Sequence, residues 1–260
     1  MRYSDFNTRL DLLLCQVNKP VNLVIDIGNT QAKIALFKER ELAEKATCSL
    51  FELHSFVEVL FAKYEIQKSI LSAVANYSPT IIRLLESQGS VIIFDEFTAI
   101  PIKNLYKSPK SLGRDRLANA IGAAHFFKNE DVLSVDMGTC IKFDLVTKNG
   151  QYVGGSISPG LNMRFKSLNT FTDKLPLLNL TDNPNLVGTE TDTSIQSGVQ
   201  WGIKKEIEGV IAEYGRQYSQ LKVVLTGGDH IYFAEAFKNS IFARPNLTLE
   251  GLNEVLIFNE

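Results

Sequence analysis

One acid lies between two arginines in the segment Gly113-Arg114-Asp115-Arg116, just before the middle of the chain. A carboxylate can accept a proton from a hydroxyl group, and an arginine can hold a carboxylate or a phosphate through two parallel hydrogen bonds. The segment therefore predicts a place where a proton leaves and a phosphoryl group arrives. The alternative is an ion pair of Asp115 with Arg114 or Arg116 at the start of a helix, where an acid is favoured in any case.

Two glycine-containing turns that begin with an acid lie on either side of that segment in the sequence. They are Asp26-Ile27-Gly28-Asn29-Thr30 and Asp136-Met137-Gly138-Thr139, and each follows a short apolar run. Glycine lets the backbone come close to a ligand, and exposed amides and hydroxyls can hydrogen-bond phosphate oxygens. Asp26 is suited to hydrated Mg²⁺, and Lys33 can add a positive charge. The first turn alone would fit an ordinary hairpin, but the second copy favours a pair of phosphate-binding turns.

A third glycine turn, Thr226-Gly227-Gly228-Asp229, follows another apolar run and is suited to backbone contact with a nucleoside. The Gly-Lys-Ser/Thr ending of a P-loop is absent from the sequence, and no dinucleotide-binding glycine pattern follows a predicted strand. The sequence thus assigns phosphate binding to acidic glycine turns between strands.

Apolar periodicity predicts an α/β chain whose pattern starts twice. Strands are expected at 22–27, 31–38, 41–49, 69–74 and 91–94, and again at 132–136, 141–147, 151–157 and 222–225. Helices are expected at 51–64, 79–88 and 113–128. The stretch 161–215 is expected to be mostly helical, with a loop at 182–190. Asp136 follows Asp26 by 110 residues, so the halves resemble a weak duplication. We expect an extension over 1–20, a first domain over 21–120 and a second over 121–260, with a shared cleft.

The composition excludes several classes of protein. With 260 residues, 45% of them hydrophobic and 22% charged, the chain fits one large or two medium globular domains. Its net charge of −2 gives no sign of a general nucleic-acid or membrane-surface binder, and no apolar run approaches the about 18 residues of a membrane span. Three scattered histidines argue against a histidine metal site, and three cysteines without metal-site spacing indicate reduced thiols. We therefore expect a cytoplasmic protein.

The start of the chain does not resemble a signal peptide. Leu10 to Leu14 is apolar, but Arg9 and Asp11 interrupt the run and no small-residue cleavage site follows. A short amphipathic helix that ends before Pro20 is the simpler prediction.

The three turns resemble those of the sugar kinase, Hsp70 and actin superfamily, and within it the chain resembles the type III pantothenate kinases. The motifs keep the family's order from residue 22 to Gly228. The residues that carry the resemblance are Asp26-Ile27-Gly28-Asn29-Thr30 with Lys33, Tyr106, Pro109, Gly113-Arg114-Asp115-Arg116 with Asn119, Asp136-Met137-Gly138-Thr139 with Asp144, Gly154-Gly155, Ile157, Pro159-Gly160, Leu175-Pro176, and Ser197-Gly198 with Gly202. Any one motif alone is weak, but the set is specific.

This resemblance implies two ribonuclease-H-like halves that flank a nucleotide cleft, and ATP-dependent phosphorylation of pantothenate to 4′-phosphopantothenate, the first step of coenzyme A biosynthesis. Asp115 matches the family's proton acceptor. Tyr106 and the segment Gly113, Arg114, Asp115 and Arg116 match its pantothenate contacts, with Arg116 suited to the substrate carboxylate. The positions that match the ATP phosphate contacts are Asp26, Ile27, Gly28, Asn29, Thr30, Gln31, Ala32 and Lys33, with Thr139 as a further ATP contact. Asp136 matches the ligand of a monovalent cation, potassium or ammonium, which would act beside ATP and Mg²⁺.

A homodimer is implied by Thr191, which aligns with a family threonine that reaches pantothenate across a dimer interface. The chain departs from the family pattern next to it, where Glu190 replaces the usual asparagine, and Thr189 and Thr193 are nearby alternatives. Cys140 follows Thr139 where a small residue is common, and we interpret it as a packing residue.

Three functions are open from the sequence alone: a pantothenate kinase, a kinase of a sugar or another small hydroxyl compound, and a non-catalytic regulator like the Bvg accessory factors. A substrate carboxylate explains Arg116 better than a neutral sugar does, and Tyr106 supports the same interpretation unless it is only a packing aromatic. A regulator would be indicated by the loss of Asp115, Asp26 or Thr139, and all three are present.

Overall fold

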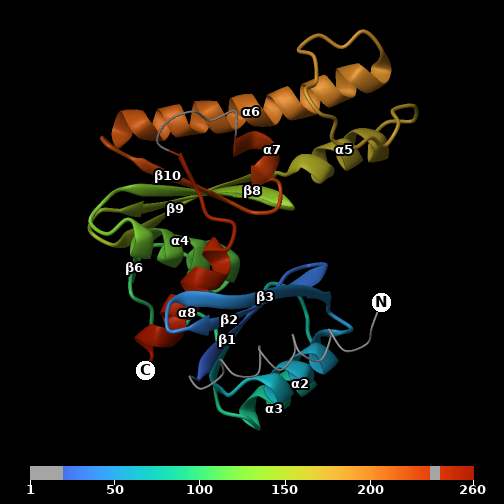
Figure 1. Cartoon of the computed structure of the whole chain (residues 1–260). Coiled ribbons are helices and arrows are strands. Elements are labelled where there is room, and N and C mark those ends of the chain that lie inside the picture. Colours follow the sequence, from blue (N-terminus) through green and yellow to red (C-terminus); the bar gives the residue numbers. More distant parts are fainter. Residues whose placement is uncertain (1–19, 235–240) are drawn as a thin grey trace, which may run out of the picture. The chain divides into compact units, whose positions relative to one another are not determined.

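The computed structural model describes residues 20–234 and 241–260, so the predicted N-terminal helix lies outside the described residues. The chain divides into two compact units (Figure 1). Of the described residues, unit 1 comprises 20–99 with Leu252–Glu260, and unit 2 comprises 100–234 with 241–251. The chain thus changes units between residues 99 and 100, whereas the sequence placed a domain boundary at 120/121, and its last residues return to unit 1.

Unit 1 is built on a five-stranded sheet in the order β3-β2-β1-β4-β5. Its strands are β1 (Val21–Ile27), β2 (Gln31–Lys38), β3 (Glu41–Ser49), β4 (Ile66–Ala73) and β5 (Ser90–Ile93). The first three strands run antiparallel, and β4 and β5 run parallel to β1. Helices α2 (Leu53–Lys63) and α3 (Pro79–Glu86) pack their buried leucines, valines and isoleucines onto one hydrophobic core with β1, β2 and β4. The Ser78 side chain caps α3, and Pro79 begins it, as expected at a helix N-terminus.

Unit 2 is built on a six-stranded sheet in the order β11-β10-β7-β8-β9-β6. Its strands are β6 (Lys103–Asn104), β7 (Val132–Met137), β8 (Cys140–Thr147), β9 (Gln151–Pro159), β10 (Lys222–Thr226) and β11 (Ile241–Ala243). Helices α5 (Leu161–Thr170) and α6 (Thr191–Gln217) cover one face of the sheet with a continuous core, and α4 (Arg114–Phe126) lies against β7 and β8 on the other face (Figure 1). A 3₁₀ turn (Pro109–Ser111) precedes α4, and α7 (His230–Ala234) and α8 (Leu247–Phe258) complete the elements of the described chain.

The two sheets repeat one topology, which confirms the predicted duplication. The order β3-β2-β1-β4-β5 in unit 1 matches β9-β8-β7-β10-β11 in unit 2, and β6 is an addition at one edge. In both sheets the acidic glycine turn joins the first two strands of the repeat. The strands and helices predicted up to residue 225 are present, but β6 is a two-residue strand without a sequence signal, and the loop between α5 and α6 extends over 171–190. After β10 the sequence predicts a helix and strand-like pieces, and the structure has α7 and β11 there but ends in a helix, α8.

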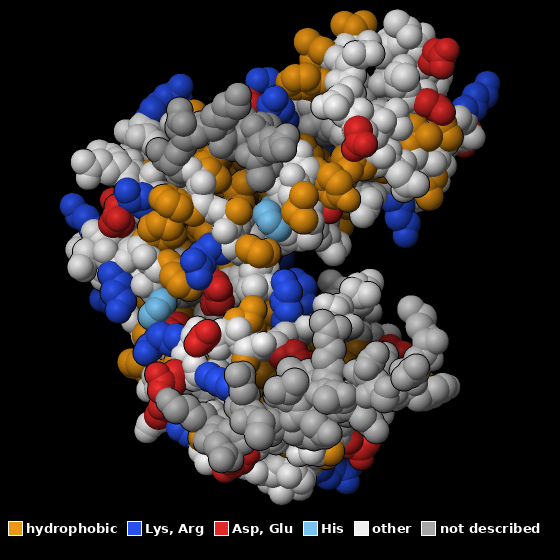
Figure 2. Space-filling view, viewed as in Figure 1, with side chains coloured by type: hydrophobic (Ala, Val, Ile, Leu, Met, Phe, Trp, Pro, Cys, Tyr) orange, Lys and Arg blue, Asp and Glu red, His pale blue; other side chains and the backbone are white. Residues whose placement is uncertain are grey.

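Large hydrophobic side chains are exposed on this long loop of unit 2. Phe171, Leu177, Leu186 and Val187 are 85%, 60%, 69% and 74% exposed. Figure 2 shows hydrophobic side chains at the surface around α5 and the start of α6. Several large exposed apolar side chains on one segment are a feature of protein interaction surfaces. Within the described residues, no helix combines the length and the hydropathy that a membrane span requires.

The helices α4 and α8 approach each other closely at two glycines, which allows a sharp test of packing. A Cβ atom at Gly251 would lie 1.9 Å from the backbone oxygen of Ala118 and 3.0 Å from the amide nitrogen of Gly122. Because backbone atoms cannot move aside cheaply, we expect Gly251→Ala to lower the free energy of unfolding by about 1–3 kcal/mol. Urea or thermal unfolding of the purified variant measures this loss.

Gly209 in α6 provides a matched control for the same substitution. It is exposed, and no atom lies within 4 Å of the position of its added Cβ. Gly209→Ala should therefore raise the free energy of unfolding by about 0.5–1 kcal/mol, since alanine loses less conformational entropy in a helix. Equal effects of the two substitutions would contradict the close packing of α4 and α8.

Candidate active site

Two glycine turns of unit 2 lie side by side at the carboxyl ends of β7 and β10. These strands are parallel, with Thr226 in register with Asp136, and the Asp229 amide donates to the Met137 carbonyl at 2.9 Å. Gly227 has φ +87°, and a Cβ atom there would lie 2.6 Å from Oδ1 of Asp136. Only glycine fits this position, because other residues rarely adopt the conformation and would collide with the acid. The second and third turns therefore form one surface around Asp136.

Lys142 links the predicted base to the second turn. Its Nζ donates to Oδ2 of Asp115 at 2.6 Å and to Oδ2 of Asp136 at 2.9 Å. Lys142 lies opposite Asp136 in the β7–β8 register, so the tight turn aims its side chain at the acid. Burial alone would lower the pKa of Lys142, but the charges of Asp136 and Asp115 outweigh burial and raise that pKa above its ordinary value. The lysine is therefore a permanent cation between two carboxylates.

Asp115 is held at the N-terminus of α4 by its own local backbone. Its Oδ1 accepts a hydrogen bond from the Arg116 amide at 2.9 Å, and Gly113 is the N-cap residue of the helix. A Cβ atom at Gly113 would lie 2.6 Å from Asp115 Oδ1, so glycine leaves room for the carboxylate. Asp115 is the acid in the first turn of α4, and Lys142 donates to its second carboxylate oxygen. A carboxylate at this position can accept a proton from a hydroxyl group.

Arg116 makes its two-pronged contact with an acid of the chain itself. Its Nε and Nη2 donate to Oδ1 of Asp144 at 3.0 Å and 2.7 Å, and the hydroxyl of Tyr152 donates to the same oxygen at 2.8 Å. Arg116 is 4% exposed and Asp144 1% exposed. Burial opposes the charge of Arg116, but the hydrogen bonds and charge of Asp144 raise the arginine pKa above its ordinary value. The guanidinium edge that the sequence suggested for a substrate carboxylate is thus already occupied by Asp144.

Tyr106 lies over the same buried pair. Its ring is 6.1 Å from that of Tyr152 at an interplanar angle of 29°, and the Arg116 Cζ lies 5.6 Å from its centre. Gly154 has φ +121°, and a Cβ atom there would approach the Tyr106 ring to 3.2 Å. The predicted substrate residue Tyr106 therefore belongs to one cluster with Arg116, Asp144 and Tyr152.

Asn119 fixes Asp136 from the side of α4. Its Nδ2 donates to Oδ2 of Asp136 at 3.3 Å, and its Oδ1 accepts from the Thr248 hydroxyl of α8 at 2.7 Å. Asn119 is completely buried. The asparagine therefore has one defined orientation, with its amide donor towards the acid.

The first turn belongs to unit 1 and is described there by itself. It joins β1 to β2 through the Gly28 amide, which donates to the Gln31 carbonyl at 3.0 Å. Asp26 is buried, and Lys33 lies opposite it in the β1–β2 register and is exposed. Among the other predicted phosphate residues, Asn29, Thr30 and Gln31 are exposed, Gly28 is half-buried, and Ile27 and Ala32 are buried. The turn thus presents polar side chains to an approaching ligand.

Thr139 and Thr191 both lie at the surface of unit 2. Thr139 is the exposed end of the second turn, and Thr191 is the first residue of α6. Glu190 caps α6 together with Thr193 in a reciprocal pair of hydrogen bonds. The replacement of the family's asparagine by Glu190 thus has a structural role, and it uses Thr193, one of the two alternatives to Thr191.

Comparison with known proteins assigns the chain to a family. The family model for type III pantothenate kinase matches residues 22–213. A type III pantothenate kinase of Christiangramia forsetii is 42% identical over 241 residues, which cover 92% of this chain and 99% of that protein. Another from Phocaeicola vulgatus is 41% identical over 241 residues, with the same coverage of the two chains.

The chain belongs to the type III pantothenate kinase family. This confirms the predicted family and enzyme class.

Solved structures confirm the fold of this family member. A Campylobacter jejuni protein described as a Baf family transcriptional activator has a TM-score of 0.60 at 21% identity and covers 91% of this chain and 98% of its own. The activator of 2-hydroxyisocaproyl-CoA dehydratase from Clostridium difficile, solved with bound ADPNP, has a TM-score of 0.52 at 14% identity, with 92% and 93% coverage. The predicted fold of two similar α/β halves is therefore confirmed.

Three contributors to the site of this kinase have no role in the sequence prediction: Lys142, Tyr152 and Asn119. Lys142 and Asp144 are two residues apart in β8 and therefore lie on the same face of the strand. A tight turn at Gly138 places Lys142 opposite Asp136. That pattern of charges on a strand was a usable signal. Tyr152 has no feature in the sequence that separates it from other strand aromatics, and Asn119 carries the family resemblance without a role of its own.

Proposed function

We propose that the chain carries out its family's reaction, ATP-dependent phosphorylation of pantothenate to 4′-phosphopantothenate at the start of coenzyme A biosynthesis, with Asp115 as the proton acceptor. The observation that supports this is the position of Asp115 at the N-terminus of α4, joined through Lys142 to the Asp136 turn. The primary hydroxyl attacks the γ-phosphorus of ATP, the bond to the β-phosphate oxygen breaks, and the hydroxyl proton passes to Asp115. ADP leaves with the electron pair of the broken bond.

Positioning and charge supply most of the acceleration in such a step. Phosphoryl transfer passes through a loose transition state that needs little early deprotonation, so a carboxylate suffices as base. Lys142 contributes a fixed positive charge beside Asp115. Gly113 to Arg116 and Tyr106 are the proposed pantothenate contacts, with Asp144 holding Arg116 in place.

We assign the phosphates of ATP to the first turn, from Asp26 to Lys33, and to Thr139. Mg²⁺ fits here, because Asp26 is a buried carboxylate at the end of a strand and this ion commonly takes one or two carboxylates plus phosphate oxygens and water. When bound, the ion would neutralise phosphate charge. The predicted monovalent cation at Asp136 fits less well, because Lys142 and Asn119 already donate to Asp136 Oδ2.

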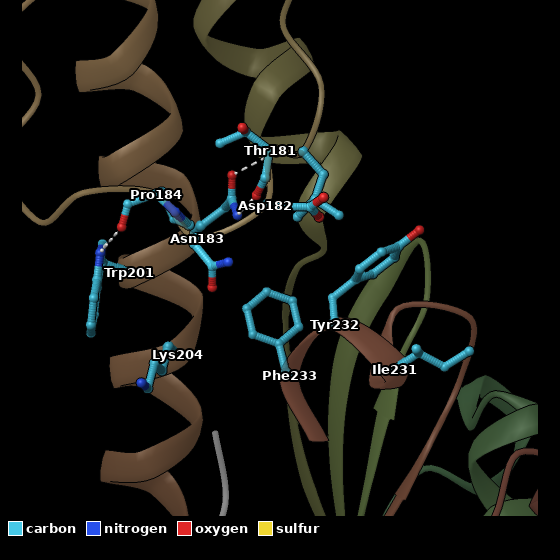
Figure 3. Close-up of a pocket in the computed structure, with 11 residues that line it drawn as sticks. Thr181, Asp182, Asn183, Pro184, Trp201, Lys204, Ile231, Tyr232 and Phe233 are labelled. Carbon is cyan, nitrogen blue, oxygen red and sulfur yellow. Dashed lines mark hydrogen bonds between the residues drawn. The ribbon is translucent and has the colours of Figure 1, made fainter. Parts of the chain in front are cut away.

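A hollow that opens directly after the third turn is suited to the nucleoside. It has a volume of about 690 Å³, within the range of ligand pockets, and it lies between α7, α6 and the loop 180–184. Figure 3 shows the ring of Phe233 of α7 facing Asn183 of that loop, with the ring of Tyr232 beside it and directed away from the loop. A flat aromatic base can pack against such rings, while the Thr226 to Asp229 backbone approaches the ribose. This hollow is separate from the Asp115 cluster, so we assign it no part in the proton transfer.

The assay that tests the function offers the purified protein ATP with pantothenate or with a panel of sugars and other small alcohols. We expect ADP release and 4′-phosphopantothenate, identified by mass, with pantothenate alone. Turnover with a sugar but not with pantothenate would support the second candidate acceptor class, and no turnover with any acceptor would support a non-catalytic regulator. The proposed cytoplasmic location stays a prediction.

We further propose a homodimer in which Thr191 reaches the pantothenate site of the neighbouring copy. The exposed hydrophobic residues of the 171–190 loop support an interface here, and Thr191 lines a hollow with Arg164 and Leu175 next to them. The proposed partner at this surface is a second copy of this protein.

Thr191→Ala should raise the KM for pantothenate by about two- to tenfold and leave kcat nearly unchanged, because a lost neutral hydrogen bond costs about 0.5–1.5 kcal/mol. Thr189→Ala should leave KM unchanged. In a mixed dimer of one Thr191→Ala subunit and one Asp115→Asn subunit, the first subunit keeps Asp115 and the second keeps Thr191. If the threonine acts across the interface, these two residues meet in one complete site. Mixing the two variants should therefore produce activity with the original KM for pantothenate. If only the raised KM is seen, Thr191 acts within its own subunit or not at all.

A further inference from the structure

The acids around the proposed reaction centre are balanced by charges of the chain itself. Asp144 pairs with Arg116, and Asp115 and Asp136 share the ammonium of Lys142. The side chains of Lys142, Asp115 and Asp136 are 17%, 20% and 12% exposed, so they are largely but not fully shielded from water. A cation that approached this site would meet a lysine that already occupies the space between both acids.

Asp136 does not fit the role of a ligand for a free potassium ion. Its Oδ2 accepts hydrogen bonds from Lys142 Nζ at 2.9 Å and from Asn119 Nδ2 at 3.3 Å, and its Oδ1 faces the Gly227 backbone. In the described part of the chain, no group of three or more acidic, histidine or cysteine side chains is arranged to hold a metal ion. Two positive charges a few ångströms apart in a partly buried site repel each other strongly, so Lys142 disfavours a second cation.

We propose that the ammonium group of Lys142 takes the place of the monovalent cation, so that this kinase carries the cation on β8 and needs no added potassium or ammonium. The group has the charge of an ammonium ion, and it contacts Asp136 and Asp115 together. Strand β8 holds it there because the tight turn after Asp136 sets the register of Lys142. A tethered cation loses less entropy than a free one when it is ordered beside the phosphate, and it is present at every salt concentration.

The first test compares turnover in potassium chloride with turnover in tetramethylammonium chloride at equal ionic strength. The kcat of the original protein should differ by less than twofold between the two salts. Lys142→Met and Lys142→Gln should lose at least tenfold in kcat in tetramethylammonium chloride and recover a large part of it when potassium or ammonium chloride is supplied. Lys148→Met is the matched control, since Lys148 is an exposed lysine at the end of the same strand, and it should behave like the original protein.

The second test does not depend on turnover. Removal of Lys142 leaves Asp115 and Asp136 close together without a cation, so potassium should bind between them and stabilise the folded state. We expect potassium, relative to tetramethylammonium, to raise the Tm of Lys142→Met by several degrees and to leave the Tm of the original protein unchanged. Circular dichroism before heating verifies that the variant is folded.

Two results would overturn the proposal. One is strong activation of the original protein by potassium. The other is that neither the Tm nor the turnover of the Lys142 variants changes when potassium or ammonium is added. The turnover arm rests on the proposed reaction, whereas the Tm arm does not. If the original protein shows no turnover with pantothenate in any salt, the proposed reaction fails, and the potassium-dependent Tm of Lys142→Met still decides the role of the lysine.

Discussion

Replacing Asp115 by asparagine should lower kcat by about 10²–10⁴-fold and leave the KM for pantothenate within a few-fold of its original value. Asparagine keeps the shape of the side chain and its hydrogen bond with the Arg116 amide, but its amide is not a base. The contacts proposed for substrate binding, Tyr106 and the α4 N-terminus, are unchanged. Steady-state kinetics with pantothenate as the varied substrate, together with a direct binding measurement by calorimetry, separate the two effects.

The competing explanation for Asp115 is a helix-start acid in an ion pair, and Glu250 tests it. Glu250 is the acid in the first turn of α8 and pairs with Arg244 at 3.1 Å. Glu250→Gln should leave kcat within twofold of the original value, since it removes a helix-start ion pair without touching the site. If Asp115→Asn also stays within twofold, Asp115 is a structural acid and the proposed mechanism is wrong.

The fold could be predicted from the sequence because its signals are local. The strand expected at 41–49 is β3 to the residue, and the strand expected at 31–38 is β2. Both follow from alternating or branched apolar residues bounded by turn residues such as Gly28-Asn29. The duplicated order of strands follows from the repeated acidic turn, because a short antiparallel turn leaves neighbouring strands few ways to pair.

Much of the site depends on pairings that the residue types do not reveal. Arg116 and Asp144 are 28 residues apart in the chain, and they meet because α4 packs on β8. An arginine beside a predicted base is equally suited to a substrate carboxylate and to a buried acid of the protein. Only the helix position decides between these partners, and sequence periodicity does not determine it.

The contact between Asn119 and Thr248 spans a still larger separation in sequence. The two residues are 129 positions apart, and they meet where α8 crosses α4 at Gly122 and Gly251. Small residues that let two backbones touch leave no periodic signal of their partner. The sequence could therefore not predict that Asn119 turns its amide towards Asp136. The position of Lys142 opposite Asp136 could be predicted, because it follows from the tight turn between β7 and β8.

Asp144→Asn should lower the free energy of unfolding by about 3–5 kcal/mol, the range found when one member of a buried ion pair is removed. The substitution hardly changes volume, but it leaves the guanidinium of Arg116 buried without a counter-charge and weakens the acceptor for Tyr152. Denaturant unfolding measures the loss. The KM for pantothenate should rise as well, because Arg116 and the Tyr106 ring above it lose their fixed positions.

Two further variants show whether the unpaired charge is the cause. Glu213→Gln breaks the exposed i,i+3 pair with Arg216 and should cost less than about 1 kcal/mol, as surface pairs do. Replacing both members, as Arg116→Met with Asp144→Leu, removes the charge and the acid together. If the loss comes from an uncompensated charge, this double variant is more stable than Asp144→Asn despite carrying two changes. A double variant that is less stable would instead mean that the pair stabilises the fold by its own attraction, and Asp144 would then be a source of stability as well as the support of Arg116.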